Sequence, residues 1–179
     1  REGEEVVVRV TVENRGWRER TGETVLDVVH VETGSVLCRR RQPYGVAAAS
    51  NQDVSASFRV PGGLAGLCRV EVHLLAEDAA IDHLEQGFVI LSATPPELPP
   101  LTLRENYLHL GDRPVFLFGS DNFGNVYTST TEGPLWWSRE HEASRDFGFT
   151  IYENLQFTPA GHQLTAADWR QFEGMAHLA

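Results

Sequence analysis

The chain has 179 residues, and its 41% hydrophobic and 22% charged content is typical of a globular protein rather than a disordered one. Its net charge is −10, with 15 basic residues that are all arginine against 25 acidic ones, which argues against a nucleic acid partner. The basic cluster Arg39-Arg40-Arg41 is expected to be a solvated strand end or turn. No apolar run approaches the ~20 residues of a membrane helix, so we expect no membrane span. A complete (β/α)8 barrel, which takes about 200 residues or more, does not fit.

Residues 5–92 alternate apolar and polar side chains in short runs, the pattern of strands with one buried face. The first run predicts that Val6, Val8, Val10 and Val12 face a core, and Phe88 opens the last run. Residues typical of turns separate the runs. About seven short strands without a convincing helix predict an antiparallel β-sandwich of the immunoglobulin or fibronectin type. We therefore assign a first domain to residues 1–92.

The first domain contains both cysteines, Cys38 and Cys68. They predict either one disulfide, which would suit a secreted or periplasmic protein, or two buried free thiols, and the sequence leaves both open. Cys38 is expected to share the inward face with Val36, and in that case a bridge between the two sheets fits the pattern.

A proline-rich segment at residues 93–100 predicts a stiff, extended connector and a domain boundary. Beyond it, strand patterns and helix patterns alternate along the chain. The first expected elements are a hairpin at 101–113 and an apolar strand at 114–119 that is buried on both faces. A helix from Trp137 to Phe147 follows, which Ser138 caps and Gly148 stops. The last two are a strand at 149–155 and a helix that begins with a capping box at Thr165. Such alternation predicts parallel pairing of the two long strands.

The segment from Leu108 to Gly119 resembles the start of the catalytic barrel in retaining glycoside hydrolases of the beta-galactosidase and beta-glucuronidase type. In those enzymes a short hairpin leads into the first barrel strand, and an immunoglobulin-like sandwich commonly precedes the barrel. Residues 137–154 are similar to the first helix and the second strand of such a barrel. The resemblance implies that residues 101–179 form the first two βα units of a (β/α)8 barrel and that the substrate is a carbohydrate.

The chain departs from that family at the ends of both expected barrel strands. Ser120-Asp121-Asn122 stands where the family usually has an Asn-His-x-Asp-like motif, and Tyr152-Glu153-Asn154 stands where it often has Val-Arg. The resemblance therefore implies a divergent branch. Its two catalytic glutamates end strands four and seven, beyond the two units that fit here, so we expect no catalytic residue in this chain and a fragment that is inactive alone.

Barrel sites form at the carboxyl ends of the strands, so the polar residues there are candidate ligands for sugar hydroxyls. These are Asp121 and Asn122 after the first strand and Glu153 and Asn154 at the end of the second, with turn or helix-start polarity as the alternative. The tryptophans of the expected loop after the first strand, residues 136 and 137, are candidates for stacking on a sugar ring. Packing in the core is their alternative role.

The seven histidines are scattered along the sequence and predict surface or core positions rather than metal ligands, so we expect neither a metal nor a cofactor. The alternative function is a non-catalytic carbohydrate-binding or cell-surface interaction module, or a purely structural sandwich. An interrupted barrel would leave a strand edge unpaired, which predicts a homodimer or a swapped oligomer.

Overall fold

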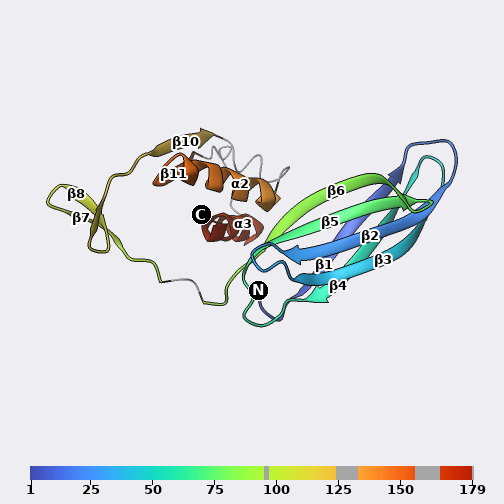
Figure 1. Ribbon diagram of the computed structural model, residues 1–179, viewed down its shortest axis with the longest axis horizontal. Coiled ribbons are helices and arrows are strands. Elements are labelled where there is room, and N and C mark those ends of the chain that lie inside the picture. The colour runs from blue at the N-terminus through green and yellow to red at the C-terminus, as the bar shows by residue number, and fades with distance from the viewer. Residues whose placement is uncertain (95–96, 124–132, 156–165, 179) are drawn as a thin grey trace. The chain divides into compact units, whose positions relative to one another are not determined.

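The structure is a computed structural model, which describes residues 1–94, 97–123, 133–155 and 166–178. It divides into two compact units, Arg1–Ser92 and Ala93–Ala179 (Figure 1). No helix among the described residues is long and apolar enough to cross a membrane.

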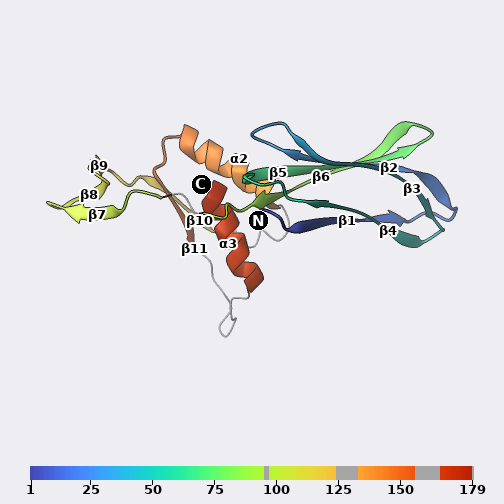
Figure 2. The same ribbon diagram turned by 90° about the horizontal axis from the view of Figure 1, so that it is seen from below.

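The first unit consists of two layers of antiparallel strands (Figure 2). One layer pairs β1 (Glu5–Asn14) with β4 (Ser50–Arg59). The other layer has the order β3-β2-β5-β6. Its strands are β2 (Arg20–His30), β3 (Val36–Val46), β5 (Gly66–Ala76) and β6 (Ala79–Ile90). The predicted β-sandwich is confirmed in this form.

The alternation read from the sequence sets the inner faces of both layers. Val12 of β1 is buried, and Val6, Val8 and Val10 are partly buried against the core, whereas Val7 is 57% exposed. Val28 and Cys68 in the larger sheet are fully buried. One apolar cluster therefore joins the two layers.

The unit has six strands of 10–12 residues instead of about seven short ones. The run from Val36 to Val46 remains a single strand although it contains Pro43 and three arginines. β3 is the edge of its sheet, where a proline removes no ladder hydrogen bond from a second neighbour. The cluster Arg39-Arg40-Arg41 thus lies within a strand, and its prediction as a strand end or turn was wrong.

The two cysteines are free and buried, so the disulfide alternative was wrong. Cys38 of β3 lies opposite Val28, and Cys68 of β5 lies opposite His30, so β2 runs between the two cysteines within one sheet. Neighbouring strands are about 4.8 Å apart, and Val28 and His30 are about 6.6 Å apart along β2, so the two Cα atoms are roughly 12 Å apart, beyond the ~7 Å limit for a disulfide. Val36 does not share the face of Cys38, because the register shifts at Val28/Val29 and leaves Val36 51% exposed.

We expect both thiols to resist a thiol reagent at about pH 8 in the native chain and to react fully in denaturant. Burial, with a smaller effect of Glu32, raises the pKa of Cys68 from its ordinary 9.0 to about 12. Because folding raises this pKa, the contribution of the neutral Cys68 thiol to folding stability is fully present below pH 9.0. It is lost as the pH rises toward about 12. Colorimetric thiol counting with and without denaturant checks this, and fast labelling of the native chain would contradict it.

His30 is a buried core histidine with partners at both ring nitrogens. Its Nδ1 lies 2.9 Å from Thr33 Oγ1, and its Nε2 lies 2.9 Å from the carbonyl oxygen of Ala65. The residue is only 2% exposed. The prediction of a core position is thus confirmed for this histidine.

The second unit begins with a three-stranded antiparallel sheet of β7 (Leu101–Arg104), β8 (Tyr107–Leu110) and β9 (Arg113–Val115). It includes the predicted hairpin. The unit continues with β10 (Gly119–Phe123), α2 (Gly133–Asp146), β11 (Ile151–Leu155) and α3 (Ala166–Leu178). β10 and β11 pair in parallel, as the alternation of strands and helices predicted.

Some boundaries in the second unit differ from the sequence prediction. The apolar segment at 114–119 is not one buried strand, because Val115 ends β9, Gly119 begins β10, and Phe116 between them is 81% exposed. α2 begins at Gly133, so Ser138 lies inside the helix and is not its cap. Gly148 does stop this helix, with a φ of 82° that glycine adopts without strain. Thr165, the expected start of the capping box, lies outside the described residues.

Candidate functional site

The two strands that carry the candidate sugar ligands lie side by side and run in the same direction. Their register puts Asp121 opposite Glu153 and Asn122 opposite Asn154. The next rung, Phe123 opposite Leu155, is the last of the pair. Four positions separated by about thirty residues of sequence therefore meet on two adjacent rungs near the carboxyl end of a parallel pair, where α/β folds bind ligands.

Thr150 anchors the beginning of this parallel pair. Its hydroxyl donates to the carbonyl oxygen of Phe116 at 2.7 Å and accepts from the backbone N–H of Phe118 at 2.9 Å. The backbone N–H of Thr150 donates to the carbonyl oxygen of Phe118 at 2.7 Å. Gly119 permits the close approach that follows, because a Cβ at this position would overlap the carbonyl oxygen of Ile151.

The two tryptophans proposed for sugar stacking do not lie in a loop. Both lie in α2, where Trp137 is 3% exposed and Trp136 is half-buried. The indole N–H of Trp137 has no hydrogen-bond partner among the described residues. Core packing, the alternative role, therefore describes Trp137.

Sequence reasoning missed an aromatic cluster at the amino ends of β10 and β11. The rings of Phe118 and Phe149 meet edge to face with centroids 5.3 Å apart, and Phe147 stacks on Phe149 at 6.3 Å. Phe147 is 80% exposed and Phe118 is 54% exposed. A run of apolar residues indicated burial here, and only the fold reveals that these rings lie at the surface of the unit.

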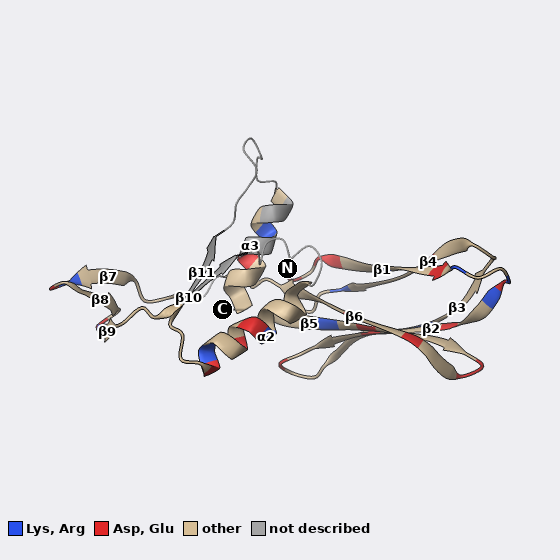
Figure 3. Ribbon diagram, turned by 90° about the horizontal axis from the view of Figure 1, so that it is seen from above, with Lys and Arg blue, Asp and Glu red and all other residues tan. Residues whose placement is uncertain are grey.

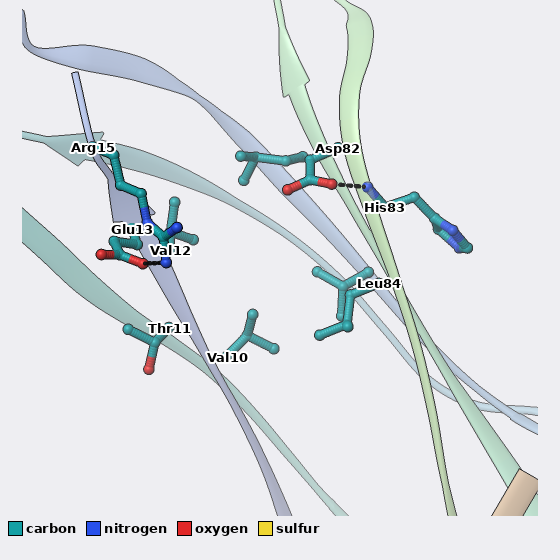
Figure 4. Close-up of a pocket in the computed structure, with 10 residues that line it drawn as sticks. Val10, Thr11, Val12, Glu13, Arg15, Asp82, His83 and Leu84 are labelled. Atoms are coloured by element: carbon teal, nitrogen blue, oxygen red, sulfur yellow. Dashed lines mark hydrogen bonds and ion pairs between the residues drawn. The ribbon is translucent and has the colours of Figure 1, made fainter. Parts of the chain in front are cut away.

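The first unit has an opening between β1 and β6, each of which is the edge of its own layer. A cavity of about 550 Å³ lies there, lined by side chains that include Val10, Glu13, Val72, Asp82 and Leu84 (Figure 4). A second cavity of about 250 Å³ follows along the same two strands. The alternation of apolar and polar residues correctly predicted that the valines of β1 face inward. It gave no information on whether a neighbouring strand covers them.

On the first unit, positions of basic and acidic residues are interspersed (Figure 3), and several of these residues form ion pairs between neighbouring strands. The Arg39 guanidinium binds both carboxylate oxygens of Asp27, at 2.7 and 2.8 Å. Arg41 binds Glu23 and also Asp78, the latter at 3.2 Å. The hydrogen bond to Asp27 raises the pKa of Arg39, and the one to Glu23 raises that of Arg41. Two arginines of the basic cluster thus have carboxylate partners, which leaves little attraction for phosphates.

One further exposed aromatic residue was not singled out from the sequence. Trp17, in the turn between β1 and β2, is 92% exposed. The buried side chain of Asn14 holds this turn, donating to the carbonyl oxygens of Arg18 and Val46 at 2.8 and 3.0 Å and accepting from the N–H of Gly16 at 3.0 Å. The indole is therefore presented to solvent on a fixed turn.

No protein-family model matches the sequence, and a search of the curated proteins finds no match. Among solved structures, a family 2 glycosyl hydrolase from Bacteroides cellulosilyticus is 14% identical, with a TM-score of 0.47 over 96% of this chain and 21% of its own. Bacteroides uniformis beta-glucuronidase is 14% identical, with a TM-score of 0.48 over 87% of this chain and 19% of its own. A putative beta-galactosidase from Bacteroides fragilis is 14% identical, with a TM-score of 0.45 over 85% of this chain and 23% of its own.

The chain spans about a fifth of the length of these solved structures. Any reaction, substrate or partner that this chain has in common with them is therefore a proposal.

Proposed function

We propose that this chain is part of a glycoside hydrolase, in which a sandwich at residues 1–92 and a connector at 93–100 precede the first two βα units of a (β/α)8 barrel at 101–179. The observation that carries the proposal is the parallel pairing of β10 and β11 across the helix α2. It agrees with the resemblance of residues 108–119 to the start of such a barrel. The reaction is hydrolysis of a glycosidic bond by two carboxylates from outside this chain.

In this proposal the polar residues at the ends of the two strands bind sugar hydroxyls. Asp121 and Glu153 share one rung of the pair, and Asn122 and Asn154 share the next. Carboxylates accept hydrogen bonds, and amides both accept and donate them, which matches hydroxyl groups that do both. Their place near the carboxyl end of a parallel pair is the place of barrel active sites.

The test is hydrolysis of aryl β-glycosides by the longest natural polypeptide that contains this chain. We expect Asp121→Ala and Glu153→Ala, which share one rung and therefore one face of the pair, each to lower kcat/KM by about 10- to 100-fold, which is about 1.4–2.7 kcal/mol of transition-state binding. Asn51→Ala, on the exposed face of β4, is the matched control and should leave kcat/KM unchanged. Full activity in both site variants would remove the proposed binding role, and the absence of any glycosidase activity would remove the proposed reaction.

We also propose that the isolated chain self-associates through the edges of its β10–β11 sheet. Among the described residues this sheet has only two strands, and an edge without a further strand is a template for one. Light scattering coupled to size-exclusion chromatography should report a mass above that of one 20.0 kDa chain. A monomer at high concentration would contradict this.

The exposed indole of Trp17 favours a second candidate function, a non-catalytic carbohydrate-binding module. An aromatic ring held on a fixed turn can stack on the apolar face of a sugar. Glycan-array binding by the chain that Trp17→Ala abolishes and Trp169→Ala preserves would support this function. Array binding that survives both substitutions would argue against it.

A further inference from the structure

Two histidines that are ten residues apart in sequence meet across the β5–β6 hairpin. His73 of β5 lies directly opposite His83 of β6. Their imidazole rings are stacked, with centroids 4.6 Å apart and an interplanar angle of 28°. The turn between the strands has positive φ at both Glu77 and Asp78, 51° and 62°, as two-residue hairpins require. A register shift at Leu74/Leu75 then moves the pairing by one residue and brings His73 opposite His83.

The pair lies on the outer face of the larger sheet. Val72 and Leu74 on either side of His73 face the inside of the sandwich, so His73 faces outward. The ring of His83 points away from the cavity between β1 and β6 (Figure 4). His73 is half-buried and His83 is exposed. Water and dissolved ions therefore reach both rings from the same side.

The neighbouring groups on this face give it a negative balance. Two rungs along, on the same face, Glu71 lies opposite Glu85, and Arg69 Nε lies 2.8 and 3.7 Å from their carboxylates. On the neighbouring strand β2, the uncharged residue Val25 lies opposite His73. Two carboxylates against one guanidinium attract a cation to the part of this face that lies next to the imidazoles.

The separation of the rings fits two imidazoles bound to one ion. With metal–nitrogen bonds of about 2.05 Å, two rings on one ion have centroids about 4.5 Å apart at a right angle and about 5.2 Å apart at the tetrahedral angle. The observed separation is 4.6 Å. Rotation about Cβ–Cγ leaves each centroid nearly in place, and this torsion of histidine is broad, so both rings can turn a nitrogen toward one point.

We propose that His73 and His83 chelate a divalent transition-metal ion of the Zn²⁺, Ni²⁺ or Cu²⁺ class on the outer face of the larger sheet. Imidazole is a preferred ligand of these ions. No group of three or more metal-binding side chains is already assembled among the described residues, so the site is a two-histidine chelate, and water completes the coordination. The sequence analysis assigned no ligand role to these histidines, because a spacing of ten residues identifies neither the hairpin nor its register.

The test is isothermal titration of the full chain with Zn²⁺ and, separately, with Ni²⁺. We expect one ion per chain, and we expect His73→Ala and His83→Ala each to weaken binding about tenfold or more, because the second imidazole of a chelate binds at a high effective concentration. The double variant should lose little more than either single one, since one remaining ring no longer chelates. His109→Ala, in β8 of the other unit, is the matched control and should bind as the parent does.

A second measurement keeps the proposal independent of any loss of stability in the variants. Paramagnetic Cu²⁺ added to the parent chain should broaden the imidazole NMR resonances of His73 and His83 before those of other histidines, whereas Zn²⁺ should shift them. Equal broadening of all histidines, or Zn²⁺ affinity unchanged by both single substitutions, would overturn the proposal. It does not depend on the proposed glycosidase function, because no readout is an activity.

Discussion

Replacement of Ile90 by alanine is expected to lower the free energy of unfolding of the first unit by about 2–5 kcal/mol, because it removes three buried carbon atoms and leaves a cavity. Ile90 is 1% exposed, ends β6 opposite Gly66, and belongs to the cluster that joins the two layers. Urea denaturation followed by circular dichroism measures the change as a lower midpoint at an unchanged slope.

Ile81→Ala is the matched control for this change, because it removes the same atoms from the same strand. Ile81 is 56% exposed, so its truncation should cost well under the buried case, within about 0.5–1 kcal/mol. Equal losses in the two variants would mean that Ile90 is not in a closely packed core. A change of slope would mean that the unit does not unfold in one step.

Replacement of Gly119 by alanine is expected to force β10 away from β11 and to destabilise the parallel pair by about 1–3 kcal/mol or more. The added Cβ would overlap the carbonyl oxygen of Ile151, and a backbone atom cannot move aside as the end of a side chain can. Hydrogen exchange read by mass spectrometry should therefore become faster in peptides from residues 119–123 and 151–155. The same change should lower the glycosidase activity that we propose for the polypeptide containing this chain.

Two substitutions of Thr150 separate this steric effect from the loss of the anchor beside it. Thr150→Ser keeps the hydroxyl that contacts Phe116 and Phe118 and should leave exchange in the two peptides nearly unchanged. Thr150→Val keeps the shape but loses both hydrogen bonds, which costs about 1–3 kcal/mol where a backbone group is left unpaired. Unchanged exchange in both Gly119→Ala and Thr150→Val would show that the two strands do not depend on this contact.

Periodicity predicted the parts of the fold in which one face of a strand meets a core. The alternation over Val6–Val12 gave the correct inward face. The register of strand pairing was not predictable, and it determines on which face Cys38 lies. The shift at Val28/Val29 turns Val36 outward and keeps Cys38 inside. A shift of one residue exchanges the two faces of a strand, and nothing local in the sequence marks it.

The second unit was predictable in its order of elements and less so in their bounds. The parallel direction of β10 and β11 followed from the intervening helix, whereas the apolar run at 114–119 indicated a single strand that the structure divides. Trp136 was misassigned to a loop because α2 begins at Gly133, before the predicted start at Trp137. The candidate site therefore rests on a predicted pairing of strands, while the stacked pair of His73 and His83 depends on a hairpin register and could only be found in the structure.

The position of the two sulfur atoms, on either side of β2 within a single sheet, has a consequence for the covalent state of the chain. A disulfide between them would require β2 to leave its place between β3 and β5. An oxidant can therefore form this disulfide only in molecules that have already unfolded. The folded domain therefore has one and the same covalent form in reducing and in oxidising surroundings, and it needs neither an oxidase nor an isomerase to mature.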